Sequence, residues 1–161
     1  LHKTKDSPKW SNVDEKHLCR IVEKLKPRHF VITGGEPCSQ DIYNLTWLLA
    51  NMGTVQVETS GTHEINVYHK TWVTVSPKVE MLGGLKILNS ALKRANELKM
   101  PINCTKDVKN LQKLIKDSNY RQLVWLQPVS QKPENTDLCV KSAMDNKWRI
   151  SIQTHKYMGV R

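Results

Sequence analysis

The sequence lacks any apolar run that approaches the roughly 20 residues needed to span a bilayer. Its start shows neither a signal-peptide pattern nor a Met, so we expect residues upstream of Leu1. It also has no CxxC pair among its four cysteines, which are Cys19, Cys38, Cys104 and Cys139. Scattered thiols argue against a disulfide framework or a zinc site and favour a reducing, cytoplasmic location.

The size and charge of the chain set broad limits on its class. With 161 residues, 39% of them hydrophobic and 25% charged, it fits one globular domain over residues 1–161. Residues 1–11 are polar and carry Pro8, so we expect them to form a loose arm. The net charge of +10 would attract nucleic acid or an anionic small substrate. The lysines are spread over several expected helices, which is typical of solvated helix faces, so charge alone does not choose between these partners.

Expected strands alternate with expected helices of 10–15 residues along the chain. Helical spacing of apolar residues predicts helices over about 12–26, 39–53, 85–98, 106–116 and 135–147, the third of them after a Gly83-Gly84 loop. Asn12 or Asp14 can cap the first of these helices, and Asn135 or Thr136 can cap the last. The expected apolar face of the first helix is Leu18, Ile21, Val22 and Leu25. Short β-branched or apolar runs predict strands around Val31 and over 54–61, 72–77, 101–104, 122–128 and 149–153. This alternation predicts an α/β fold with a mostly parallel sheet and right-handed crossovers. Six strands with helices on one side suggest an incomplete parallel βα barrel whose first βα units are missing.

The most distinctive stretch is Thr33–Pro37, which reads Thr-Gly-Gly-Glu-Pro and follows the strand around Val31. Two adjacent glycines allow main-chain N–H groups to approach a ligand closely, because they carry no Cβ. A strand that opens through glycine into a helix is where α/β folds bind ligands, at the carboxyl edge of the sheet. A tight turn with an incidental glutamate would give the same spacing.

Polar residues also follow other expected strands at their carboxyl ends. Because parallel strands bring these ends to one face, we expect one shared ligand site there. The stretches concerned are Thr33–Glu36, Glu58–Gly61, Ser76–Lys78, Gln127–Pro128 and Gln153–Lys156.

Thr33–Pro37 resembles the S-adenosylmethionine-binding motif of the radical S-adenosylmethionine superfamily. Within it, the chain most resembles the 7-carboxy-7-deazaguanine synthases of queuosine biosynthesis, a tRNA modification pathway. The stretches that carry this resemblance are 31–38, 57–64, 72–78, 126–131 and 148–157. The resemblance implies a lyase that converts 6-carboxy-5,6,7,8-tetrahydropterin to 7-carboxy-7-deazaguanine with loss of ammonia. It implies S-adenosylmethionine, a 4Fe-4S cluster and Mg2+ as cofactors, a flavodoxin-type reductant and a homodimer, with neither membrane nor nucleic acid as a partner.

The resemblance also implies roles for individual residues. Glu36 would accept a hydrogen bond from the α-amino group of S-adenosylmethionine. Thr33 would contact the pterin, and His155 would lie in a tail that closes over it. No catalytic residue and no metal ligand is assigned. Ser76 could equally cap a turn, and His155 could equally be a surface histidine without a role in binding. The implied cofactor contacts are Gly35, Glu36, Ser76, Pro77, Lys78, Gln127 and Pro128.

The chain departs from the family pattern in one respect. The family holds its cluster with three closely spaced cysteines, and no such group is present here. We therefore predict no radical chemistry from these 161 residues alone. Two alternatives stay open: a non-catalytic module that binds protein or RNA, and an activase for a glycyl-radical enzyme, which would share the Gly-Gly-Glu-Pro turn.

Overall fold

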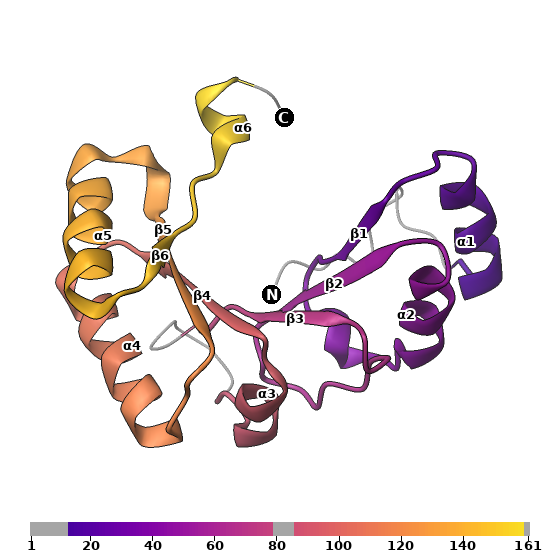
Figure 1. The fold of residues 1–161 in the computed structure, drawn as a ribbon, viewed down its shortest axis with the longest axis horizontal. Helices are drawn as coiled ribbons and strands as arrows, with labels where there is room; N and C mark the ends of the chain where they lie inside the picture. The colour runs from indigo at the N-terminus through magenta and orange to yellow at the C-terminus, as the bar shows by residue number, and fades with distance from the viewer. Residues whose placement is uncertain (1–12, 79–85, 160–161) are drawn as a thin grey trace.

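Six parallel strands form one sheet in sequence order, β1-β2-β3-β4-β5-β6 (Figure 1). The structure is a computed structural model that describes residues 13–78 and 86–159, so the expected arm at 1–11 and the Gly83-Gly84 loop lie outside the described residues. The alternation in the sequence is thus confirmed as a parallel α/β sheet. The strands are β1 (His29–Ile32), β2 (Thr54–Thr59), β3 (Trp72–Val75), β4 (Glu97–Ile102), β5 (Leu123–Pro128) and β6 (Arg149–Ile150).

The helices cover one face of this sheet. A sheet whose strands follow one another in sequence order returns each connection over the same side, because the crossovers share one hand. Figure 1 shows the result as an open arc of strands with helices on its outer side, and β1 and β6 form its two free edges. The described helices are α1 (Glu15–Glu23), η2 (Pro37–Ser39), α2 (Tyr43–Ala50), α3 (Asn89–Arg94), α4 (Thr105–Ser118), η3 (Val129–Gln131), α5 (Pro133–Asn146) and α6 (Thr154–Tyr157).

Side chains alternate strictly between the two faces of the sheet, as strand geometry requires. The outer face carries Val57, Val73, Leu98 and Leu126, each fully buried against the helices. The inner face carries mainly polar or amphipathic residues at the intervening positions, and almost all of these are half-buried or exposed. The hydrophobic core therefore lies between sheet and helices, and the hollow side of the arc is polar.

The first helix begins where the sequence predicts. The side chain of Asp14 accepts a hydrogen bond from the amide of His17 at 2.8 Å and caps α1. Its expected apolar face is only partly confirmed: Val22 packs on a small core cluster, whereas Ile21 is 46% exposed and Leu25 is 75% exposed. The helix also ends at Glu23, before the expected limit near residue 26.

The expected helix over 85–98 is confirmed only over its middle part. Residues 86–88 are not helical, α3 covers only Asn89–Arg94, and β4 starts at Glu97. Asn96 makes the change: its amide donates to the Val73 carbonyl at 2.9 Å, and its side-chain oxygen accepts from the Val73 amide at 2.8 Å. Pairing with β3 on one side and β5 on the other therefore overrides a locally helical sequence.

The last third of the chain shows two further differences. Helix α5 begins at Pro133 with Lys132 at the N-cap, and not at Asn135 or Thr136, because proline is well suited to the first helical position. The expected strand over 149–153 is shorter in the structure, where only Arg149 and Ile150 pair with β5. Across the described ranges, no helix has the length and apolar character needed to cross a bilayer.

Candidate functional site

Glu36 is the centre of a hydrogen-bonded cluster at the carboxyl edge of the sheet. One carboxylate oxygen accepts from the Cys38 amide at 3.0 Å and from the Thr59 hydroxyl at 2.5 Å. The other accepts from the Ser60 amide at 2.8 Å and from the Ser60 hydroxyl. The glutamate therefore ties the turn after β1 to the end of β2, and both of its oxygens are engaged by protein donors.

This environment favours the ionised form of the glutamate. Burial opposes ionisation, but the hydrogen bonds from the side chains of Ser60 and Thr59 and from the amides of Ser60 and Cys38 outweigh it, so the pKa of Glu36 lies below its ordinary value. The carboxylate thus serves as a fixed negative anchor. A ligand ammonium placed here, as the resemblance implies, would share oxygens that already accept four hydrogen bonds.

The same cluster reaches the end of β3. The Ser76 amide donates to the Thr59 carbonyl at 2.7 Å, and the Gly61 amide donates to the Thr59 hydroxyl at 3.1 Å. Three of the stretches expected to share a site, 33–36, 58–61 and 76–78, are thereby joined through Thr59. The strand ends meet because β1, β2 and β3 are neighbours in the sheet.

The glycine pair leaves room beside the backbone. A Cβ added at Gly34 or at Gly35 would meet no heavy atom within 4 Å. Gly34 has φ of +137°, a conformation that residues with side chains rarely adopt, which explains glycine at that position. Gly35 has no such constraint, so its lack of a side chain instead keeps its main chain open to the surface.

The other expected cofactor residues separate into two groups by face. Ser76 and Gln127 are half-buried and belong to the inner face, and Lys78 is exposed. Pro77 and Pro128 are buried, and they occupy positions that alternate with those of the inner face, so their side chains belong to the outer, core-facing side of the sheet. Thr33 is exposed after β1, and His155 is exposed on α6, which Figure 1 shows extending beyond the carboxyl edge of β5 and β6.

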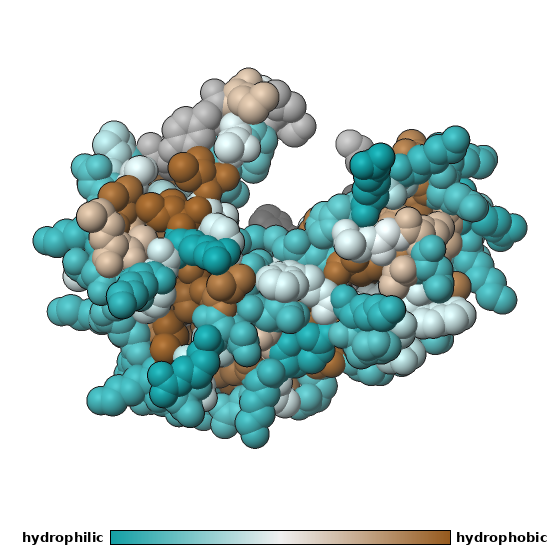
Figure 2. Space-filling view, viewed as in Figure 1, coloured by the Kyte–Doolittle hydropathy of each residue, from teal (hydrophilic) through white to brown (hydrophobic). Residues whose placement is uncertain are grey.

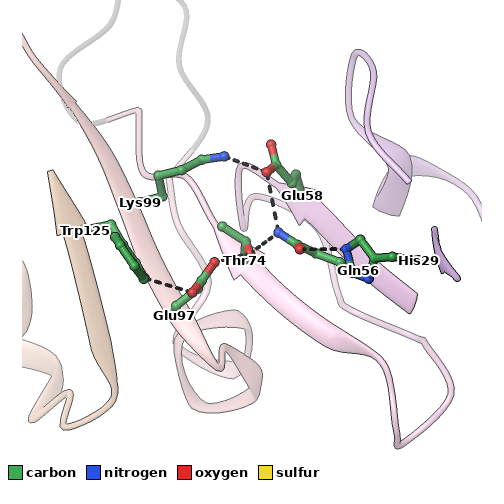
Figure 3. A network of polar contacts seen from close by, with 7 residues as sticks. All are labelled: His29, Gln56, Glu58, Thr74, Glu97, Lys99 and Trp125. Carbon is green, nitrogen blue, oxygen red and sulfur yellow. Dashed lines mark hydrogen bonds and ion pairs between the residues drawn. The ribbon is translucent and has the colours of Figure 1, made fainter. Parts of the chain in front are cut away.

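A polar network crosses the inner face from strand to strand (Figure 3). Gln56 on β2 donates to the Thr74 hydroxyl at 2.9 Å, and Thr74 donates to Glu97 at 2.7 Å. Glu97 also accepts from the indole nitrogen of Trp125 at 2.8 Å. On β1, the His29 ring contacts the Gln56 side-chain oxygen at 3.3 Å. The network thus joins strands β1 to β5 across the middle of the sheet, before the carboxyl ends of the strands.

An ion pair lies on the same face closer to the carboxyl edge. The Lys99 ammonium contacts a Glu58 carboxylate oxygen at 2.5 Å, with side chains 20% and 29% exposed (Figure 3). Arg149 on β6 places its guanidinium 5.2 Å from the centre of the Trp125 ring, a cation–π contact. In the space-filling view, a broad notch opens above this face, between the part of the molecule that carries α6 and the part that carries α1 (Figure 2). The inner face therefore offers donors, acceptors and both charges.

No metal centre is visible among the described residues. Within 13–78 and 86–159, no three His, Cys, Asp or Glu side chains are placed to hold a metal ion together. Cys38, the cysteine nearest the glycine pair, is buried, and burial together with the charge of Glu36 raises its pKa, which keeps the thiol protonated. These residues do not fit a 4Fe-4S cluster, which requires several thiolates.

Several residues of the site have no assigned role at the sequence level. Thr59 and Ser60 lie in an expected stretch, but sequence alone does not show that they hold Glu36. Glu97 lies at the end of an expected helix and Lys99 lies just beyond it, so the sequence analysis does not place them on one strand face. The alternation of polar and apolar residues in 97–102 is the signal that could have revealed it.

Comparison with known proteins identifies close relatives. No family model matches the chain. The 7-carboxy-7-deazaguanine synthase of Escherichia coli K12 is 44% identical over 165 residues, covering 99% of this chain and 74% of that protein. The synthase of Buchnera aphidicola is 36% identical, covering 100% and 74%. The crystal structure of QueE from Escherichia coli superposes with a TM-score of 0.84 at 42% identity, covering 95% of this chain and 69% of that one. The chain therefore belongs to the 7-carboxy-7-deazaguanine synthase family.

Proposed function

We propose that this chain is the S-adenosylmethionine- and pterin-binding part of an enzyme that makes 7-carboxy-7-deazaguanine from 6-carboxy-5,6,7,8-tetrahydropterin. The observation that carries the proposal is the cluster around Glu36, which joins three strand ends and leaves the backbone of Gly34 and Gly35 open beside them. Its support from relatives is the 44% identity to a synthase over nearly the whole chain.

The described residues fit S-adenosylmethionine better than they fit its cluster. The open main chain at Gly35 can approach the methionine end, and Lys78 supplies a cation suited to its carboxylate. Gln127, on the far half of the arc, can border the nucleotide end. When bound beside a reduced cluster, S-adenosylmethionine supplies the radical that starts such reactions. The described residues do not themselves supply a site for that cluster.

The pterin would lie on the inner face of the arc. A pterin presents an amide-like edge of donors and acceptors together with a carboxylate, and the Glu58–Lys99 pair can complement both kinds of group. Thr33 and Trp125 border the same face. The net charge of +10 favours the approach of an anionic substrate. In this arrangement the chain binds and orients the substrate.

Three finer features are proposed on the family resemblance alone. They are assistance by Mg2+, reduction by a flavodoxin-type protein and assembly as a homodimer. Mg2+ added to the chain with substrate should increase the affinity for the pterin if the first is correct. Sedimentation velocity measures the third directly.

The central proposal is tested by titrating the purified chain with S-adenosylhomocysteine, which lacks the reactive methyl group, in a calorimeter. Lys78→Met should raise the Kd about five- to tenfold, because one charge-assisted hydrogen bond is lost at an exposed site. Lys70→Met is the matched control, since Lys70 is an exposed lysine before the opposite end of β3. The control should change the Kd less than twofold. Absence of binding by the unaltered chain, or equal effects of the two variants, would contradict the proposal.

A further inference from the structure

Asn135 is a buried amide that the site described above does not use. Its side chain, only 3% exposed, donates to the Val129 carbonyl at 2.9 Å and to the Asn103 side-chain oxygen at 3.3 Å. Val129 follows β5, and Asn103 follows β4. One amide from the start of α5 therefore joins the turns that leave two neighbouring strands at the carboxyl edge.

Backbone pairing stops at this point of the sheet. The ladder between β4 and β5 ends with Ile102 opposite Pro128, and proline has no N–H to continue it. Beyond it, Ser130 adopts φ of +59° and ψ of +20°, the left-handed conformation that is unfavourable for a residue with a side chain. Such a turn persists only where surrounding contacts fix it.

The two hydrogen bonds of Asn135 supply such contacts. Its acceptor Asn103 is itself held, because the Asn103 amide donates to the Asp107 carboxylate at 2.8 Å. Asn135 is three positions from the N-cap of α5, and its side chain donates to the Val129 carbonyl, which precedes that cap in the chain. Buried polar side chains are normally hydrogen-bonded, and the bonds of Asn135 go to the turn and not to the amides at the end of the helix. We therefore assign this side chain the role of holding the turn.

We propose that Asn135 is a positioning residue that fixes the Val129–Gln131 turn in the shape that borders the nucleotide end of bound S-adenosylmethionine. This inference rests on the proposed function. Gln127 lies just before the turn and opposite Pro101 in the register, so a shift of the turn displaces the part of β5 that faces the ligand. Asn135 itself touches the protein, and its effect on the ligand passes through the Val129 backbone.

The test uses two ligands that differ in one part. S-adenosylhomocysteine carries both the nucleoside and the amino-acid portion, and 5′-methylthioadenosine carries only the nucleoside. Asn135→Ala should raise the Kd of both by the same factor, about tenfold, because the turn borders the portion that they share. Lys78→Met should raise the Kd of the first ligand alone.

Asn146→Ala is the matched control. Asn146 is on the same helix, and its side-chain amide likewise donates to a backbone carbonyl, that of Ser142 at 2.8 Å, but it lies at the opposite end of α5. Hydrogen exchange provides a second readout: the amides of residues 129–131 should exchange faster in Asn135→Ala and unchanged in Asn146→Ala. If Asn135→Ala does not fold, Asn103→Ala removes one of the two bonds from an exposed position, and it should raise both Kd values two- to threefold.

The outcomes separate the two proposals. If the unaltered chain binds neither ligand, the proposed function fails and the role of Asn135 falls with it. If the unaltered chain binds both and Asn135→Ala binds them equally well, only the role of Asn135 is overturned. Weaker binding of S-adenosylhomocysteine without weaker binding of methylthioadenosine would also overturn it, since the turn would then act on the wrong end of the ligand.

Discussion

The anchor at Glu36 can be tested by replacing its charge without changing its shape. In Glu36→Gln, one side-chain oxygen remains, and the other becomes an NH2 group that faces protein donors. The four donors at this site are two amides and two hydroxyls, from Cys38, Thr59 and Ser60. Whichever way the new amide turns, one pair of donors loses its acceptor.

The expected loss of stability follows from the hydrogen bonds. A bond to a charged group contributes about 1.5–3 kcal/mol, so two lost bonds correspond to roughly 3–6 kcal/mol. Because Glu36 is only half-buried, water replaces part of this loss, and we expect about 3 kcal/mol. For a domain of this size that corresponds to a decrease in Tm of roughly 6–12 °C.

The contribution should also depend on pH in a defined direction. The pKa of Glu36 is lowered in the folded chain, so its stabilising effect is complete above the ordinary carboxyl value of 4.5. It is lost as the pH falls below that value toward the lowered folded pKa. The difference in unfolding free energy between the unaltered chain and Glu36→Gln should therefore be constant from about pH 6 to 8 and become smaller below about pH 4.5.

Urea unfolding followed by circular dichroism measures these differences. Glu64→Gln is the control, because Glu64 is exposed and accepts one hydrogen bond, from the Ser90 hydroxyl at 2.8 Å. It should cost less than about 1 kcal/mol. The reasoning is refuted if Glu36→Gln costs no more than this control, or if its effect grows at low pH.

Three further changes test other parts of the structure. Tyr120→Phe should leave the free energy of unfolding unchanged or raise it by up to about 1 kcal/mol, because the buried Tyr120 hydroxyl has no partner among the described residues; a loss above about 1 kcal/mol in urea unfolding would contradict this. Glu97→Gln should cost about 1–2 kcal/mol by the same assay, since Thr74 and Trp125 both donate to this carboxylate and an amide can accept from only one of them. Iodoacetamide at pH 8 should label exposed Cys104 well before buried Cys139, whose pKa burial raises to about 11; mass spectrometry of the labelled peptides would show the reverse order if the burial were wrong.

Much of the fold follows from local sequence, because helices and strands alternate and their ends are marked by capping and turn residues. Asp14 caps the first helix as expected, and the apolar positions Val108 and Leu111 are buried on α4. Strands such as 54–59 and 123–128 are β-rich and bounded by turn residues. Parallel order and helices on one side then follow from the shared hand of the crossovers.

The parts that sequence could not predict depend on contacts between distant segments. The switch from α3 to β4 is set by Asn96, which pairs with Val73 more than twenty residues earlier. In the site, the Gly-Gly-Glu turn and the strand ends could be named in advance, but not the partners of Glu36. Pro77 and Pro128 are among the expected ligand contacts, but their side chains are buried, which only the structure shows.

The seam between β3 and β4 divides the sheet into two halves of three strands each. Only two residue pairs, Thr74 with Glu97 and Val75 with Leu98, continue the ladder across it, compared with six between β4 and β5. Side chains fasten it further, through Thr74–Glu97 and Glu58–Lys99. The glycine turn belongs to one half and Gln127 to the other. A molecule that contacts both halves would therefore bridge a seam held by only two backbone residue pairs, and its binding would stiffen the sheet that forms the site.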